Sequence, residues 1–166
     1  MTVSENAAQR ALDIINNLGG VVSEFRDNWL AVQAYSTAYE NGGDQRSTII
    51  HAIESSLSED VCQAILVKFE TEIQYLHSSP VGDLRFENSH DRFYQNGNRD
   101  IQAVINTDNS SQVRLAHLVC VVYQIRCNLD HGHKELTTAR SQKLFDIGNR
   151  IIQAVIEALV PISKAS

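Results

Sequence analysis

Residues 111–126, SQVRLAHLVCVVYQIR, form the most apolar long stretch of the chain. A helix drawn through this stretch carries apolar side chains on almost every face, which is typical of a helix that is buried on most sides. Such a helix needs other elements packed around it. We therefore expect residues 111–126 to form the central helix of a folded domain.

Apolar residues at spacings of three and four predict further helices along the chain. The expected helices cover residues 4–18, 23–40, 45–56, 58–76 and 139–160. Ser58 and Thr138 stand where N-caps are expected, and Pro161 is expected to end the last helix. Strand-type alternation is absent, so we expect an all-α fold, a single-domain bundle of five to six helices over residues 1–166.

Residues 77–110 are rich in Asn, Ser, Asp and Gly and lack a clear helical period, so they predict a long irregular loop before the central helix. At most one short helix is expected, near residues 98–106. The stretch also alternates aromatic residues with arginines, namely Phe86, Phe93 and Tyr94 with Arg85, Arg92 and Arg99. These side chains either stack and clamp single-stranded RNA or pin the loop to the domain, and the second reading is favoured.

The formal net charge of −6 argues against a protein that binds nucleic acid with its whole surface. The charge is uneven along the chain. Residues 1–110 hold seven Lys and Arg against sixteen Asp and Glu, whereas residues 111–166 hold seven against four. The difference in charge has two explanations, namely a local binding site for a polyanion in the C-terminal third or a chance fluctuation of surface charge.

The three cysteines lie at spacings that fit neither a zinc ribbon nor a redox pair, and this usage is typical of a reducing compartment. The N-terminus lacks the basic start and apolar run of a targeting signal, and no segment is long and apolar enough to span a membrane. We expect a cytoplasmic protein that does not bind membranes.

The stretch YQIRCNLDHGHK, residues 123–134, concentrates charged and titratable side chains directly after the central helix. On one continuous helix Arg126 and His131 would point about 140° apart, so they could not act together. Asparagine, aspartate and glycine within residues 128–132 are types that end or cap helices. A break there would bring the imidazole toward the guanidinium.

This motif resembles the signature of the HEPN superfamily (higher eukaryotes and prokaryotes nucleotide-binding), in which an arginine is followed after four to six residues by a histidine. The full stretch YQIRCNLDHGHK is closer to bacterial members near the Apea-like and abortive-infection branches, and the resemblance covers the motif-bearing core, about residues 111–160. It implies a small helical domain that forms a homodimer. The motif copies would face each other across the interface and cleave RNA without a metal ion.

The resemblance also implies roles for individual residues. Arg126 would hold the phosphate, and His131 would be the general acid and base for attack by the ribose 2′-hydroxyl. Asn128 would orient the histidine or the substrate. His133 and Lys134 would add phosphate contacts.

Two residues depart from the family pattern. Cys127 follows the arginine, where the family more often has a polar side chain, and Asp130 precedes the histidine, where an apolar residue is expected. Asp130 would weaken RNA binding by repulsion but would favour the charged form of His131. A plainer interpretation is that Arg126 and Asp130 form an ion pair one helical turn apart.

We therefore expect an endoribonuclease, a hydrolase of the toxin–antitoxin or antiviral defence type, restrained by an antitoxin or another regulatory protein. The alternative is a non-catalytic HEPN-type dimer that binds nucleotide or RNA or serves as an assembly module. A metal site at His131 and His133 is the weakest reading, since further ligands would have to come from residues such as His90 and His117. No metal and no cofactor are expected.

Overall fold

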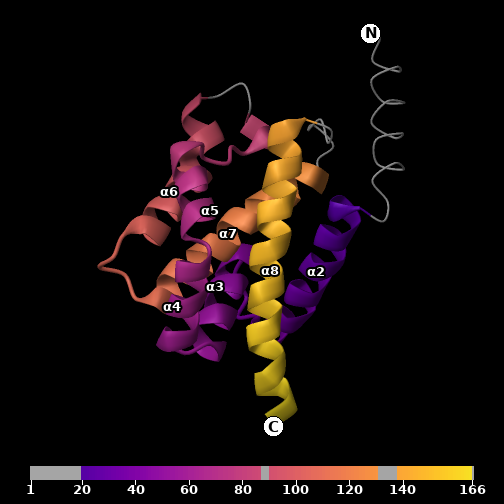
Figure 1. The fold of residues 1–166 in the computed structure, drawn as a ribbon, viewed down its shortest axis with the longest axis vertical. Helices are drawn as coiled ribbons and strands as arrows, with labels where there is room; N and C mark the ends of the chain where they lie inside the picture. The colour runs from indigo at the N-terminus through magenta and orange to yellow at the C-terminus, as the bar shows by residue number, and fades with distance from the viewer. Residues whose placement is uncertain (1–19, 87–89, 131–137, 166) are drawn as a thin grey trace.

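The computed structural model describes residues 20–86, 90–130 and 138–165, and this part of the chain is helical without a strand (Figure 1). The α-helices are α2 (Val21–Ser36), α3 (Gln45–Ser56), α4 (Glu59–Lys68), α5 (Glu70–Ser78), α6 (His90–Ile105), α7 (Ser111–Asp130) and α8 (Ala139–Ala165). Two short 3₁₀ helices, η1 (Thr37–Tyr39) and η2 (Leu84–Phe86), complete the described elements. The prediction of an all-α fold is confirmed for these residues. The helix expected at residues 4–18 lies outside them.

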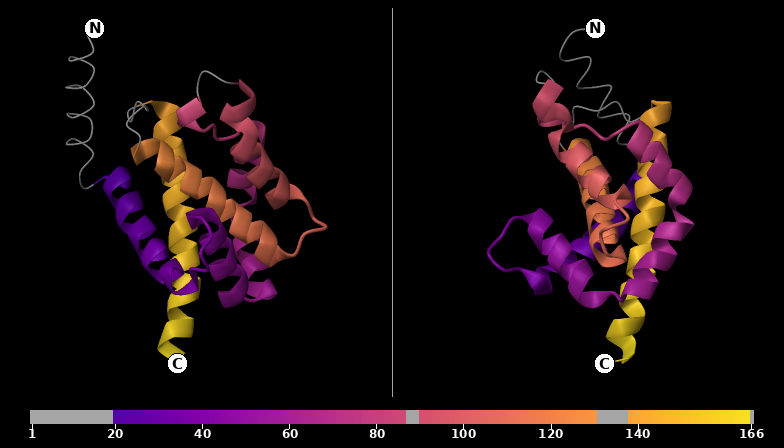
Figure 2. Two further views of the ribbon diagram at one scale, coloured as in Figure 1. Left: turned by 180° about the vertical axis from the view of Figure 1, so that it is seen from behind. Right: turned by 90° about the vertical axis from the view of Figure 1, so that its left-hand side faces the viewer.

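Helix α7 is the centre of the packing, as predicted. It contacts α3, α4, α6 and α8, and Figure 2 shows it between α6 on one side and α2 with α3 on the other. Leu115, Leu118 and Val122 are fully buried. The apolar character of this helix on all sides is therefore accounted for by burial within its own chain.

Helices α2 and α8 form the most extensive pair and join the two ends of the described chain (Figure 1). Their close approach depends on Gly148, where an added Cβ would lie 3.0 Å from the ring of Phe25. A hydrogen bond of 2.6 Å from Asn28 Nδ2 to Asn149 Oδ1 links the same two helices.

The chain from residue 58 to 78 forms two helices where one was predicted. Ser58 accepts a hydrogen bond from Val61 N, so the predicted N-cap is confirmed. Phe69 has φ −105° and ψ 21°, which interrupts the helix between α4 and α5. Its side chain is buried like those of Ile65 and Ile73, so the apolar face continues from α4 into α5 across the interruption.

The prediction of a long irregular loop over residues 77–110 is wrong, because the 16 residues of α6 fill almost half of it. The buried face of α6 includes Gly97, Asp100, Ile101 and Val104. A glycine and an aspartate stand where apolar periodicity requires apolar side chains, so the pattern does not reveal the helix. With α6 and the division of residues 58–78, the described residues hold seven α-helices rather than five or six.

The C-terminal ends of the last two helices differ from expectation. Helix α7 continues past Arg126 to Asp130 without a break at Asn128, and residues 131–137 lie outside the described part of the chain. Thr138 Oγ1 accepts a hydrogen bond from Ser141 N at the start of α8, which confirms the predicted N-cap. Helix α8 runs through Pro161 to Ala165, so the proline does not end it.

None of the helices in the described part of the chain has both the length and the apolar character needed to cross a membrane.

Candidate functional site

The last turns of α7 hold three of the predicted site residues. Arg126 is partly exposed, Asn128 is buried, and Asp130 is the final residue of the helix. His131, His133 and Lys134 lie outside the described residues. The predicted approach of His131 to Arg126 therefore stays a prediction.

Tyr123 lies one turn before Cys127, and its pKa is affected by the charges of two guanidinium groups. Burial raises the pKa of Tyr123 to about 12, and a hydrogen bond with Cys127 acts in the same direction. The charges of Arg126 and Arg85 oppose this rise. Arg126 belongs to this part of α7. The hydrogen bond from Leu84 N to Asn128 Oδ1 brings the segment that carries Arg85 beside it.

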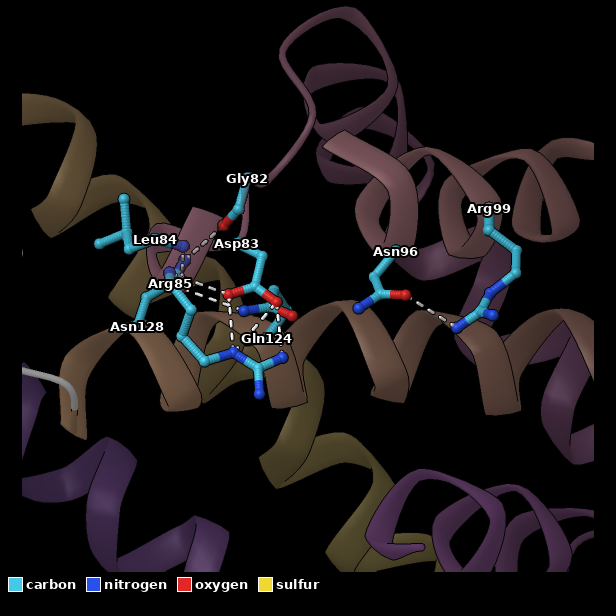
Figure 3. A network of polar contacts seen from close by, with 8 residues as sticks. All are labelled: Gly82, Asp83, Leu84, Arg85, Asn96, Arg99, Gln124 and Asn128. Carbon is cyan, nitrogen blue, oxygen red and sulfur yellow. Dashed lines mark hydrogen bonds and ion pairs between the residues drawn. The ribbon is translucent and has the colours of Figure 1, made fainter. Parts of the chain in front are cut away.

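Asn128 attaches the chain before η2 to α7 (Figure 3). Its Oδ1 accepts hydrogen bonds from Leu84 N at 3.2 Å and from Gln124 Nε2 at 3.0 Å. Its Nδ2 donates to Gly82 O at 2.7 Å. The amide thus holds in place the segment that carries Arg85. Its predicted action on His131 or on substrate stays a prediction.

Arg85 is fixed by Asp83, whose carboxylate is fully buried (Figure 3). Arg85 Nε donates to Oδ1 at 3.0 Å and to Oδ2 at 3.2 Å, and Nη2 donates to Oδ2 at 2.6 Å. The hydrogen bonds with Asp83 raise the pKa of Arg85, so the guanidinium stays charged. The Arg85 side chain is nevertheless 51% exposed, which makes it an oriented cation at the surface.

Phe86 lies beside two guanidiniums. The Cζ atom of Arg85 is 5.4 Å from the ring centroid and that of Arg92 is 5.6 Å from it, within the range of a cation–π interaction. Arg92 is exposed on α6. Arg85 and Arg92, which come from different elements, therefore share one small area of surface.

Arg99 is a further exposed arginine on α6, and its Nη2 donates to Asn96 Oδ1 at 3.1 Å (Figure 3). Positions 92, 96 and 99 recur at spacings of four and three, so they share one face of the helix. Arg92 and Arg99 are thus arranged along one face of α6. Sequence reasoning named these residues but missed Asp83, which appeared as an ordinary loop aspartate.

A second buried carboxylate joins three helices. Arg46 of α3 bonds to Asp100 of α6 through Nη2 and Nε, and His117 Nδ1 of α7 lies 2.9 Å from Asp100 Oδ1. Burial lowers the pKa of Arg46, but the hydrogen bond and charge of Asp100 outweigh this effect and raise it overall. We interpret this cluster as structural, because it holds α3, α6 and α7 together. Its members lie 17 to 71 residues apart, which hides it from sequence patterns.

The buried thiols are poor nucleophiles. Burial raises the pKa of Cys62 to about 11 and that of Cys120 to about 12. In the described ranges, no group of three or more His, Cys, Asp or Glu side chains is arranged to hold a metal ion. The metal reading that uses His131 and His133 falls outside those ranges.

A cavity of about 480 Å³ lies beside Asn128, between the end of α5 and the start of α8. Its lining consists mainly of short hydroxyl side chains, aliphatic residues and the guanidinium of Arg140. That guanidinium donates to Ser79 Oγ at 2.5 Å, to Ser79 O at 3.1 Å and to Pro80 O at 3.2 Å. Arg140 therefore serves to join α8 to the segment after α5.

Comparison of the chain with protein-family models, curated proteins and solved structures finds no match.

Proposed function

We propose that the protein is a metal-independent endoribonuclease of HEPN type whose site lies at the C-terminal end of α7. The observation that carries the proposal is that two arginines belong to the end of the helix that leads into the motif. Arg126 lies on its last turns, and the segment that carries Arg85 is bonded to Asn128. Arg85 is held there by the buried Asp83. Two cations at one end of a helix suit a phosphodiester whose negative charge increases during cleavage.

The proposed reaction is an attack of the ribose 2′-hydroxyl on the adjacent phosphorus. The hydroxyl loses its proton, the phosphorane gains a second negative charge, and the 5′-oxygen leaves with a proton. His131 acts as general acid and base, and Arg126 binds the phosphoryl oxygens through its planar fork. Asn128 positions the neighbouring segment, and His133 and Lys134 add contacts to phosphate.

The proposed setting is the cytoplasm, where the enzyme acts as a toxin or antiviral defence effector under the control of an antitoxin or regulatory partner. A homodimer with facing motifs would place two arginines and two histidines around one RNA. The burial of α7 within its own chain removes one reason to expect a dimer. The other reason remains, because one arginine and one histidine from a single subunit make a poor catalytic site.

The first prediction is that His131→Ala and Arg126→Ala each abolish cleavage of a mixed RNA by the purified protein in EDTA. Loss of a general acid or base typically costs about 10²–10⁴-fold in rate. The melting temperature should change by only a few degrees, because Arg126 is partly exposed and lies near the helix end. His77→Ala is the matched control, since His77 is an exposed histidine on α5.

Unchanged cleavage by His131→Ala would contradict the catalytic proposal. If the wild type binds RNA or nucleotide without cutting RNA, the non-catalytic dimer is the better function. Activity that EDTA removes and zinc or manganese restores would instead indicate the metal site at His131 and His133.

A further inference from the structure

We propose that the surface formed by the exposed Arg85, Arg92 and Arg99 and the half-buried Phe86 binds single-stranded RNA and leads it toward Arg126. We refer to these four residues as the arginine face. The inference rests on the proposed function in one respect, namely that the RNA is led to a cleavage site at Arg126. Binding of RNA to the arginine face can be measured without cleavage.

The first support is that Arg85 is already oriented. Its bonds to Asp83 use Nε and Nη2, while Nη1 points away from that carboxylate in Figure 3. A fully buried carboxylate beneath a half-exposed guanidinium restricts its conformations before a ligand binds. Less conformational entropy is then lost on binding a phosphate.

The second support is the sharing of Phe86 by two arginines. Guanidinium planes and aromatic rings are both surfaces on which unpaired bases stack. Arg85 and Arg92 also carry charge, so one small area offers contacts to a base and to a phosphate. This combination favours a single strand, because the bases of a duplex are already stacked on each other.

The third support is the position of Arg99. It follows Arg92 by seven residues on α6, which is about 10.5 Å along the helix axis. The face therefore runs from Arg99 through Arg92 to Arg85, and the segment that carries Arg85 is bonded through Leu84 N to Asn128, two residues after Arg126. A strand that follows these charges reaches the end of α7.

Acidic side chains near the arginine face oppose the binding of RNA. The Asp44 carboxylate has a lowered pKa, mainly because of its hydrogen bond from Ser47 N, and Arg99 contributes a small further lowering. An anion is therefore close to the Arg99 end of the face. The sequence also places Glu87 and Asp91 in the same stretch. RNA affinity should accordingly be moderate and sensitive to salt.

An acidic peptide is the competing partner for an arginine-rich surface. Its carboxylates can pair with guanidiniums, but it has no planar bases to stack on the group formed by Arg85, Phe86 and Arg92. The observed pairing of one ring with two guanidiniums therefore favours RNA.

The second prediction is tested by fluorescence anisotropy with a fluorescein-labelled 12-nucleotide RNA of mixed sequence, fully 2′-O-methylated. This probe lacks the attacking hydroxyl, so it reports binding alone. Arg92→Gln/Arg99→Gln should weaken binding by at least about tenfold at low salt. It should also reduce the slope of log affinity against log salt by about 1.4, since each lost single-strand phosphate contact removes about 0.7.

Arg150→Gln is the matched control. Arg150 is a partly exposed arginine on α8 that pairs with Glu72 and Asp146, away from the arginine face. Its replacement should leave RNA affinity within about twofold, as expected for a residue that contacts no phosphate. Circular dichroism of each variant checks that the helices are retained.

Equal affinity of the wild type and Arg92→Gln/Arg99→Gln would overturn the inference. So would equal affinity for a duplex of the same sequence, or full displacement of the RNA by poly-glutamate at matched charge. The methylated probe separates the two proposals, because it reports binding whether or not unmodified RNA is cleaved. Binding that depends on the arginine face without any cleavage of unmodified RNA would refute the enzyme and leave this inference standing.

Discussion

At the scale of single residues, two glycines show how closely the helices approach. A Cβ at Gly97 would overlap the carbonyl oxygen of Val81, whereas one at Gly148 would lie 3.0 Å from the Phe25 ring. The first obstacle is backbone that Asn128 also holds in place through Gly82. The second is a side chain that can shift by a few tenths of an ångström.

The third prediction compares alanine at these two positions. Gly97→Ala should lower the free energy of unfolding by about 2 kcal/mol or more, because the strain of overpacking exceeds the gain of about 1 kcal/mol from alanine's helix propensity. Gly148→Ala should be within about 1 kcal/mol of the wild type, since the two effects nearly cancel there. Urea unfolding followed by circular dichroism measures both.

Equal stability of the two variants would show that the segment around Val81 yields as easily as the Phe25 ring. Gly97→Ala should also reduce the affinity of the arginine face for RNA, because the displaced segment carries Asp83 and Arg85.

At the scale of helices, the start of α7 is capped from another helix. Glu59 of α4 accepts hydrogen bonds from Ser111 N at 2.7 Å and from Gln112 N at 3.3 Å. These backbone donors are groups that a helix leaves unsatisfied at its N-terminus. The hydrogen bond from Ser111 N is the main cause of the lowered pKa of Glu59.

The fourth prediction concerns pH and Glu59. A carboxyl group with a lowered folded-state pKa stabilises the fold above its ordinary pKa of about 4.3, and this contribution is lost as the pH falls through the lowered value. Glu59→Gln should therefore be less stable than the wild type at pH 7, with a difference that shrinks by pH 3. Urea titrations at both pH values measure it.

Asp60→Asn is the control, because it neutralises an exposed carboxylate in the same first turn of α4. A stability difference between Glu59→Gln and the wild type that stays constant from pH 7 to pH 3 would exclude an ionised cap.

Local signals account for what could be predicted of the elements. Ser58 and Thr138 are N-caps whose partners lie three residues away, so the sequence displays both halves of the interaction. The cap from Glu59 bridges 52 residues and could not be seen. Helix α6 was predicted only in part, near residues 98–106. The burial of Gly97 and Asp100 depends on contacts with Val81, Arg46 and His117, which lie far away in the sequence.

The candidate site was only partly predictable. Arg126 and Asn128 were named because they belong to a short motif. The importance of Arg85 depends on Asp83 beneath it and on α7 beside it, and both relations arise only on folding. The continuation of α7 to Asp130 was obscured by residue types that commonly end helices but are also tolerated inside them.

At the scale of the whole molecule, α7 is enclosed by helices of its own chain. A dimer formed at the motif would therefore add an interface without supplying the core. This arrangement predicts that the subunits separate without unfolding.

The fifth prediction is that dilution separates the proposed dimer while the far-ultraviolet circular dichroism stays constant. Light scattering at micromolar concentration should give twice the subunit mass, and the monomer should retain its helices because the buried residues of α7 keep their partners. Loss of helicity together with dissociation would show that the partner completes the core. A monomer at micromolar concentration would contradict the dimer itself.

The pairing of α2 with α8 has a consequence during synthesis of the chain. Phe25 packs near Phe145 and Trp29 stacks on Tyr123, so both aromatic residues depend on helices that are made much later. Asn28 and its partner Asn149 are 121 residues apart. At about 5–20 residues per second, the ribosome takes roughly 6–24 s to make that span. The apolar face of α2 leaves the ribosome long before its cover, and for that interval it is a surface for chaperones to shield.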